Sequence, residues 1–355
     1  MGAPFPPVWC LIVPRQGTLG AIREEVLSRG LSPPSTGQCY LRAMADAPRT
    51  ALDVLARAPT EPTWQSLPEL WEAYTSIRAE GCSPLVSAAH VAARADRLGQ
   101  AFAVGYPAAL ERLVPGVGLP CAFCVTEKDG NGPRAIETIL EPVEGGYRLS
   151  GHKTFVTFGT LAKSLIIVAR VGKKSDGRPD LAVVRVPTQR DGIRVEELPP
   201  MPFVPEVVHA RLVLHGVEVH ADERLPGDGY LGYVKPFRTI EDIHVIAATI
   251  AYLVGWARRT RVNSNLRAEL SADLVALDAL ASAEPLDPRT HLALHGCYSR
   301  VLQALAGDDF TSLLAAASGD ERLRWERDRV LLDVASKARK ARFEAANRAL
   351  ESNQD

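Results

Sequence analysis

A proline- and glycine-rich segment, Val114-Pro-Gly-Val-Gly-Leu-Pro120, separates two kinds of hydrophobic pattern in this chain of 355 residues. Before it, from about Ala51, apolar residues recur three and four positions apart, which indicates helices. After it, β-branched runs such as Leu165-Ile-Ile-Val-Ala-Arg-Val and Leu181-Ala-Val-Val-Arg-Val indicate strands. From Phe237 the helical pattern returns. The sequence therefore predicts helices, then a β region, then helices.

We place the domain boundaries where these patterns change. Residues 1–119 are predicted to form a helical N-terminal domain, in which residues 1–50 are atypical. Residues 120–227 are predicted to form a β-barrel, although the strand pattern alone would also fit a sandwich. Residues 228–355 are predicted to form a shortened C-terminal helical bundle. The fold class is thus α+β with three domains.

Three local signals predict particular helices. Pro68, followed by acidic residues, is suited to the first turn of a helix. The stretch from Ile240 to Leu266 has the length of a mostly apolar core helix. Ser318-Gly-Asp-Glu321 is a candidate capping box at the start of a charged amphipathic helix over 320–350. Its mixed charges are typical of a solvated face.

The composition argues against several classes of protein. Hydrophobic residues make up 46% and charged residues 23% of the chain, as in ordinary globular proteins. The net charge of −1 argues against a nucleic-acid or anionic-membrane binder. We expect no membrane span and no signal peptide, because we find neither a long enough apolar run nor a basic region near the start. The six cysteines form no disulfide framework, so we expect reduced thiols and a cytoplasmic protein.

Two segments of the predicted β region place hydroxyl side chains beside aromatic ones. The first reads Cys121-Ala-Phe-Cys-Val-Thr-Glu127 and the second Gly151-His-Lys-Thr-Phe-Val-Thr-Phe-Gly159. A flat, polar, redox-active ring could lie against such a surface. Thr126 and Thr157 would be its hydrogen-bond partners, and Phe123 or Phe155 its stacking face.

This pair of segments resembles the flavin-binding middle domain of the acyl-CoA dehydrogenase family. There, aromatic-x-x-Thr-Glu-Pro and a Gly/Ser loop precede Gly-x-Lys-x-Trp-Ile-Thr-Asn-Gly. The resemblance covers roughly Trp71 to Arg267 and implies FAD as the cofactor. It also implies a homodimer or homotetramer, because Arg267 matches a family arginine that reaches the flavin pyrophosphate of the neighbouring subunit. The implied cofactor contacts are Phe123, Val125, Thr126, Gly132, Phe155, Thr157 and Arg267.

The same resemblance implies α,β-dehydrogenation of an acyl thioester, carried by CoA or by an acyl carrier protein. Such a reaction needs a carboxylate that takes the α-proton, and burial would raise the pKa of that base toward the working pH. In isovaleryl-type members the base lies early in the first C-terminal helix, and Glu241 falls on that position. The alternative interpretation of Glu241 is a first-turn acid favoured by the helix dipole.

Several positions depart from the family pattern. Lys128-Asp-Gly-Asn-Gly-Pro-Arg134 replaces Pro-Gly-Ala-Gly-Ser-Asp, and Asp242 replaces an arginine. No Gly-Gly-x-Gly loop follows residue 300. Two alternatives therefore stay open, a catalytically silent paralogue that binds a partner or an acyl group, and a flavoenzyme of other chemistry on this scaffold. Cys121-x-x-Cys124 has no second cysteine pair, so we expect no metal site.

Overall fold

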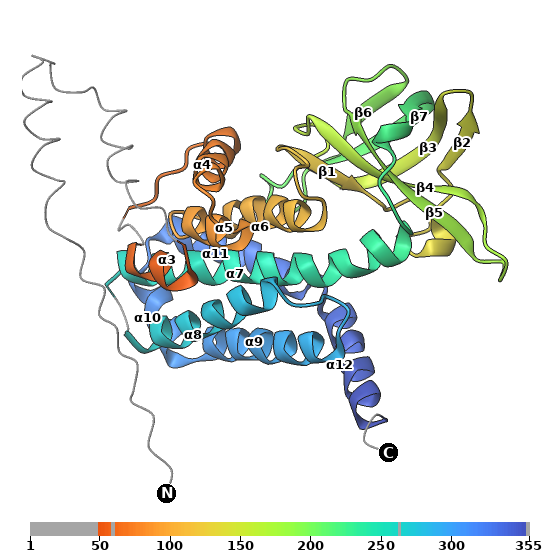
Figure 1. Ribbon diagram of the computed structural model, residues 1–355. Helices are drawn as coiled ribbons and strands as arrows, with labels where there is room; N and C mark the ends of the chain where they lie inside the picture. The colour runs from red at the N-terminus through yellow and green to blue at the C-terminus, as the bar shows by residue number, and fades with distance from the viewer. Residues whose placement is uncertain (1–48, 58–60, 262–263, 353–355) are drawn as a thin grey trace, which may run out of the picture. The chain divides into compact units, whose positions relative to one another are not determined.

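The computed structural model describes residues 49–57, 61–261 and 264–352. The chain divides into two units, residues 1–47 and 48–355, and all the described residues belong to the second. The prediction that residues 1–50 are atypical therefore lies almost entirely outside them. Within the second unit the order of helices, strands and helices is confirmed (Figure 1). The domain boundaries at 119/120 and 227/228 stay predictions.

Four described helices precede the sheet. In α4, Ser66 caps the first turn by accepting a hydrogen bond from the Glu69 amide, and Pro68 lies in that turn, as predicted. In α6, Gly105 allows a close approach to the later helix α7, because a Cβ there would lie 2.8 Å from the Cα of Val245. The four helices are α3 (Ala51–Arg57), α4 (Leu67–Ala79), α5 (Pro84–Ala92) and α6 (Leu98–Leu113).

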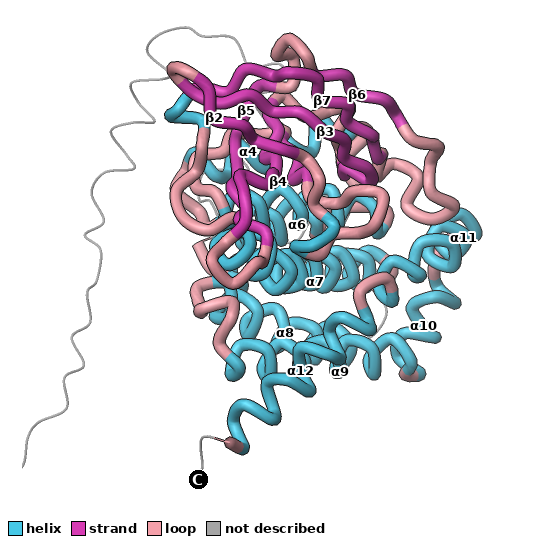
Figure 2. Tube along the Cα trace, turned by 90° about the vertical axis from the view of Figure 1, so that its right-hand side faces the viewer, coloured by secondary structure: helices cyan, strands magenta, loops and turns pink. Residues whose placement is uncertain are grey.

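The middle of the chain forms one seven-stranded sheet that curls around an apolar core (Figure 2). The strand order is β1-β4-β2-β3-β7-β6, and β5 pairs with β4. Strands β1, β5 and β6 each pair with a single neighbour, so the predicted barrel is an open half-barrel. The strands are β1 (Cys121–Cys124), β2 (Ile139–Val143), β3 (Gly146–Thr157), β4 (Ser164–Lys173), β5 (Pro179–Pro187), β6 (Ile193–Glu197) and β7 (His209–His220).

The helices that follow the sheet differ in their ends from the sequence prediction. The core helix α7 ends at Arg259, well before Leu266, and Arg261 beyond it has a left-handed φ of 56°. The predicted helix over 320–350 is two helices joined by a 3₁₀ turn, and its capping box at Ser318 is present. These helices are α7 (Lys235–Arg259), α8 (Ser264–Ala281), α9 (Pro288–Ala306), α10 (Asp308–Ala316), α11 (Gly319–Asp328) and α12 (Ser336–Glu351).

One helical stretch, Tyr230–Arg259, is long and apolar enough to cross a membrane by length and composition alone. The sequence predicts most of it as an apolar core helix, beginning at Ile240. In the fold, 89% of its most apolar window is buried inside the protein. Such burial is what a core helix of a helical bundle shows, since its neighbours cover it on every side.

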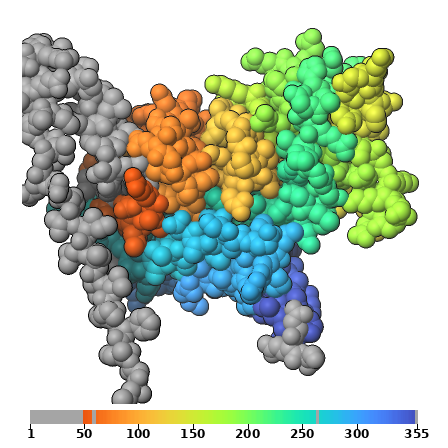
Figure 3. All heavy atoms as spheres, in the orientation of Figure 1, coloured from red at the N-terminus to blue at the C-terminus, as the bar shows by residue number. Residues whose placement is uncertain are grey.

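An aromatic cluster joins the sheet to the helical layers. In the space-filling view, the sheet and the helices form one continuous surface (Figure 3). Phe158 packs edge-on against Trp71 of α4, with ring centroids 5.3 Å apart. Phe123 of β1 packs in the same manner against Phe237 of α7, at 4.9 Å. Tyr106 of α6 contacts both Phe158 and Phe237 at 5.9 Å. These five residues are called the aromatic cluster below.

Candidate active site

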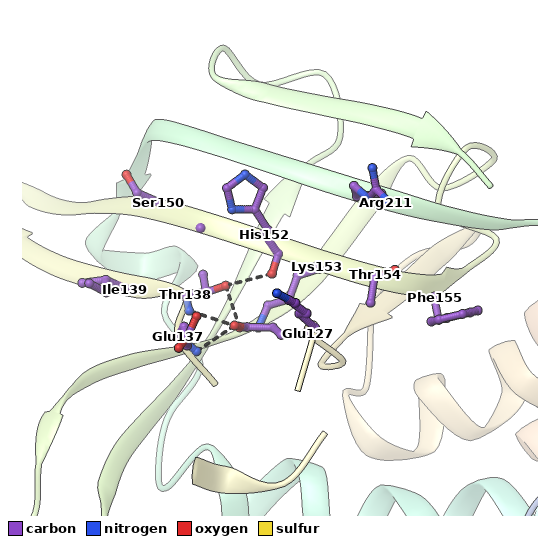
Figure 4. Close-up of a pocket in the computed structure, with 12 residues that line it drawn as sticks. Glu127, Glu137, Thr138, Ile139, Ser150, His152, Lys153, Thr154, Phe155 and Arg211 are labelled. Atoms are coloured by element: carbon purple, nitrogen blue, oxygen red, sulfur yellow. Dashed lines mark hydrogen bonds and ion pairs between the residues drawn. The ribbon is translucent and has the colours of Figure 1, made fainter. Parts of the chain in front are cut away.

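A groove of about 820 Å³ opens beside the ends of β1 and β3, where the two sequence segments meet (Figure 4). The Thr154 amide donates a hydrogen bond to the Thr126 carbonyl at 2.8 Å, which fixes the two segments side by side. Strand β7 contributes one further wall residue, Arg211. The groove's central lining residues are Glu127, Thr138, His152, Lys153, Thr154 and Phe155.

A buried ion pair forms the floor of this groove. The Lys153 ammonium is fully buried and lies 2.6 Å from Oε1 of Glu127. Glu127 also accepts hydrogen bonds from the Glu137 amide at 2.7 Å and from the Thr138 hydroxyl at 2.8 Å. Burial raises the pKa of Glu127, but Lys153 and these donors outweigh burial and lower it. Lys153 also donates to the Val125 carbonyl at 3.3 Å, so the pair holds the backbone on either side of Thr126.

Phe155 has an unusual backbone conformation and an exposed ring. Its φ is 50°, a region that bulky side chains rarely adopt, and the pairing of β3 with β7 shifts register between Lys153 and Val156. The ring is 57% exposed at the groove and packs edge-on against His209, with ring centroids 6.3 Å apart. Strain kept beside a cavity, with an aromatic face turned outward, is typical of a ligand-binding position.

The two threonines named from the sequence are not among the residues that line the groove, but each is near one in the chain: Thr126 precedes Glu127, and Thr157 lies two residues after Phe155. Thr126 follows β1 and Thr157 ends β3, where it pairs with His209. Both side chains are partly buried, and neither hydroxyl makes a hydrogen bond within the described residues. Val125 is also partly buried, next to Thr126. Two free hydroxyls beside an exposed aromatic ring suit the polar edge and the flat face of a flavin.

Phe123 and Glu241 are brought close together by the packing of α7. Phe237 lies one helical turn before Glu241, so the two side chains share a face of α7. The ring of Phe237 packs on Phe123, and the Tyr106 hydroxyl accepts a hydrogen bond from the Phe123 amide at 3.1 Å. Burial raises the pKa of Tyr106, and the charge of Glu241 raises it further, so the carboxylate lies near this phenol.

Glu241 is partly buried and makes no hydrogen bond or ion pair with any described residue. Burial raises its pKa from 4.5 to about 8, and the neighbouring Asp242 contributes to the rise. Arg342, Arg238 and Arg339 act in the opposite direction but do not outweigh burial. An unpartnered carboxyl whose pKa lies near neutral pH has the properties of a general base.

Asp242, which stands where the family has an arginine, forms ion pairs with two arginines of α12. It accepts hydrogen bonds from Arg339, at 3.0 Å, and from Arg342, both on α12. Arg339 also donates to the Tyr298 hydroxyl at 2.9 Å. The two arginines are therefore committed to Asp242, and Glu241 is left without a direct cationic partner.

Of the described residues named from the sequence, Phe155 lines this groove, whereas Gly132 and Arg267 lie elsewhere in the structure. Gly132 precedes a 3₁₀ turn and lines a different pocket, with Lys174 and Lys235. Arg267 lies on α8 and is not among the residues that line the groove. The assignment of Arg267 was to a neighbouring subunit, so a single chain does not test it. The cofactor role of Gly132 likewise stays a prediction.

The sequence reading missed Lys153 and Asp242. The signal for Lys153 was present, because the family pattern itself contains a lysine in Gly-x-Lys and a glutamate in Thr-Glu-Pro. Both residues are kept here as Lys153 and Glu127, and their pairing explains why. No signal predicted the contact of Asp242 with Arg339 and Arg342, since about a hundred residues separate them.

Residues 122–217 match the acyl-CoA dehydrogenase middle domain. This segment of the chain is therefore a middle domain of the acyl-CoA dehydrogenase type. The resemblance drawn from the two sequence segments is therefore confirmed. The comparison with curated protein sequences finds no match.

Solved structures of the acyl-CoA dehydrogenase fold confirm the fold class. Butyryl-CoA dehydrogenase from Megasphaera elsdenii is 15% identical, with a TM-score of 0.56 over 84% of this chain and 89% of that one. Glutaryl-CoA dehydrogenase from Mycobacterium smegmatis, in complex with FADH2, is 15% identical, with a TM-score of 0.56 over 82% and 88%. The prolyl acyl carrier protein oxidase AnaB is 17% identical, with a TM-score of 0.54 over 74% and 82%.

Proposed function

We propose that this protein removes hydrogen from the α and β carbons of an acyl thioester, with Glu241 as the base. The thioester is carried by CoA or by an acyl carrier protein. The observation that carries the proposal is the unpartnered Glu241 carboxyl, whose pKa is raised to about 8 and which lies one turn from the Phe237–Phe123 contact. Structures of the same fold include a butyryl-CoA dehydrogenase and a prolyl acyl carrier protein oxidase.

The residues beside the groove fit FAD. Thr126 and Thr157 have free hydroxyls, which would hydrogen-bond the polar edge of the ring system, and Phe155 presents an exposed ring to its face. The ion pair of Lys153 and Glu127 holds the backbone beside Thr126 in place. When bound, FAD supplies an acceptor for the hydride that leaves the β-carbon.

Glu241 takes the α-proton onto a carboxylate oxygen as the double bond forms between the α and β carbons. It must be ionised to do so, and with a pKa of about 8 only a minor fraction is ionised at pH 7. Phe123, Tyr106 and Phe237 keep water from its apolar side. A cytoplasmic location and a homodimer or homotetramer remain part of the proposal.

The first experiment is the visible absorption spectrum of the purified full chain, before and after incubation with FAD and gel filtration. We expect a flavin spectrum that stays with the protein, and turnover of acyl-CoA or carrier-bound thioesters with an artificial electron acceptor. The value of kcat/KM should increase with pH up to about 8, because Glu241 becomes ionised over that range.

Glu241→Gln is the decisive variant, with Glu269→Gln on the exposed face of α8 as its matched control. We expect Glu241→Gln to keep the flavin spectrum and to lose about 10²- to 10⁴-fold in kcat, the usual contribution of a general base. Full turnover in Glu241→Gln would remove the base assignment. A protein that cannot be loaded with FAD would instead support the silent paralogue.

A further inference from the structure

A second cavity, of about 430 Å³, lies between α7, α9 and α12 and shares no lining residue with the groove of Figure 4. In Figure 1, α12 lies beside one end of α7 and one end of α9. The proposed function gives this cavity no role. Its size is within the range of small-molecule sites.

Three positively charged side chains line the cavity. Lys235 and Arg238 from α7 line it, together with Arg342 from α12. No aspartate or glutamate is among the lining residues. Within the described part of the chain, Lys235 makes no hydrogen bond or ion pair. Arg238 makes a single hydrogen bond, to the side-chain oxygen of Asn131 at 3.0 Å.

Two nearby carboxylates, Asp242 and Asp287, do not cancel this charge, because each already has its own arginine. A third, Glu241, is in the field of Arg342 and Arg238, but burial raises its pKa to about 8, so it is mostly neutral at pH 7. Asp242 is shared between Arg339 and Arg342, so it offsets at most one of these two cations. Asp287, at the start of α9, is held by Arg289 on its exposed side. The three lining cations therefore outnumber the carboxylates paired with them, and this excess of positive charge favours an anion.

The rest of the wall suits the organic part of a ligand. Four alanines of α12 give a small apolar surface, namely Ala338, Ala341, Ala345 and Ala346. Thr239 of α7 and His291 of α9 also line the cavity and form a polar pair, with Oγ1 and Nε2 3.2 Å apart. Burial lowers the pKa of His291, and its Nε2 also lies 2.9 Å from the Pro285 carbonyl, so the ring is held in place at the cavity wall.

We propose that the cavity between α7, α9 and α12 binds a small molecule that carries a phosphate ester. Guanidinium groups match the geometry of phosphate oxygens, and the ammonium of Lys235 adds a third cation. The proposal does not rest on dehydrogenase activity, since it follows from the charge and the walls of this cavity alone.

The test is isothermal titration calorimetry of the full chain with glycerol 3-phosphate, and with glycerol as the neutral comparison, at constant ionic strength. We expect saturable binding of glycerol 3-phosphate and none of glycerol. Lys235→Gln should weaken binding about tenfold, as expected on losing one charge-assisted hydrogen bond, and Lys235→Gln/Arg238→Gln should weaken it further. Lys235 is exposed and unpartnered, so Lys235→Gln should fold normally.

Lys340→Gln is the matched control. It removes the same charge from α12, but Lys340 is 76% exposed and lies outside the cavity lining. We expect this variant to bind like the unmodified chain. Absence of saturable binding, or equal weakening by Lys340→Gln and Lys235→Gln, would overturn the proposal. Because the readout is binding, either result leaves the dehydrogenase assay as an independent measurement.

Discussion

Glu241 should make the stability of the protein depend on pH, whether or not a ligand is bound. Burial raises its pKa from 4.5 to about 8, so the folded chain holds this proton more tightly than the unfolded chain. Between these two pH values the unfolded state loses the proton first, and the free energy of unfolding falls as pH rises. At about 1.4 kcal/mol per pH unit, the whole contribution is on the order of 5 kcal/mol.

Glu241→Gln removes this dependence, because the amide stays neutral at every pH. We expect the variant and the unmodified chain to have similar stability near pH 4.5, where the carboxyl is protonated in the folded state. Above pH 8 the variant should be more stable, by at most about 5 kcal/mol, since the side chain is partly exposed and solvent screens its charge.

Urea denaturation followed by circular dichroism, from pH 4.5 to pH 9, measures this difference directly. The exposed Glu269→Gln should follow the unmodified chain at every pH. If Glu241→Gln also follows the unmodified chain, the carboxyl is not held in the environment described above. Its role as a base with a raised pKa would then be refuted on grounds separate from turnover.

Two further variants test the groove. Lys153→Met leaves the Glu127 carboxylate buried without its cation, so we expect the free energy of unfolding to fall by about 3–5 kcal/mol. Adding Glu127→Gln should recover most of this loss. Thermal denaturation measures both variants, and equal instability of the single and double variants would contradict the prediction. Thr157→Val removes a free hydroxyl and keeps a side chain of similar volume. The affinity for FAD, measured by fluorescence, should therefore fall about two- to tenfold, while the thermal midpoint of the FAD-free protein stays unchanged. An unaltered affinity would exclude this hydroxyl as a contact.

The sequence predicted the parts of the fold that depend on local signals. Ser318 with Glu321 forms the capping box that the spacing indicates, since both partners lie within one turn. The break after α11 was not predictable from periodicity. There the Leu332 carbonyl accepts hydrogen bonds from Tyr298, at 2.6 Å, and from Arg339. These side chains, from α9 and from the first turns of α12, replace a helical hydrogen bond of the Leu332 carbonyl, and the hydrophobic pattern does not encode them.

The candidate site was predictable where residues follow each other along a strand. Thr126 and Phe155 lie beside the groove because each belongs to a short segment with a recognisable pattern. The same reasoning placed Gly132 with them, but Glu127 and Gly130 form a bridge that turns the chain, and Gly132 faces another pocket. Pairs such as Lys153 with Glu127 depend on how strands are placed in space, which spacing alone does not determine.

The aromatic cluster has a consequence for how this protein can be divided. Phe123 and Phe158 come from the sheet region, yet their rings are buried against Trp71, Tyr106 and Phe237 of the helices. Excised alone, the sheet would expose two large apolar rings and lose their packing partners. Sheet and helices are therefore expected to unfold in one cooperative transition, and the middle domain is not a module that can be transplanted without its helical neighbours.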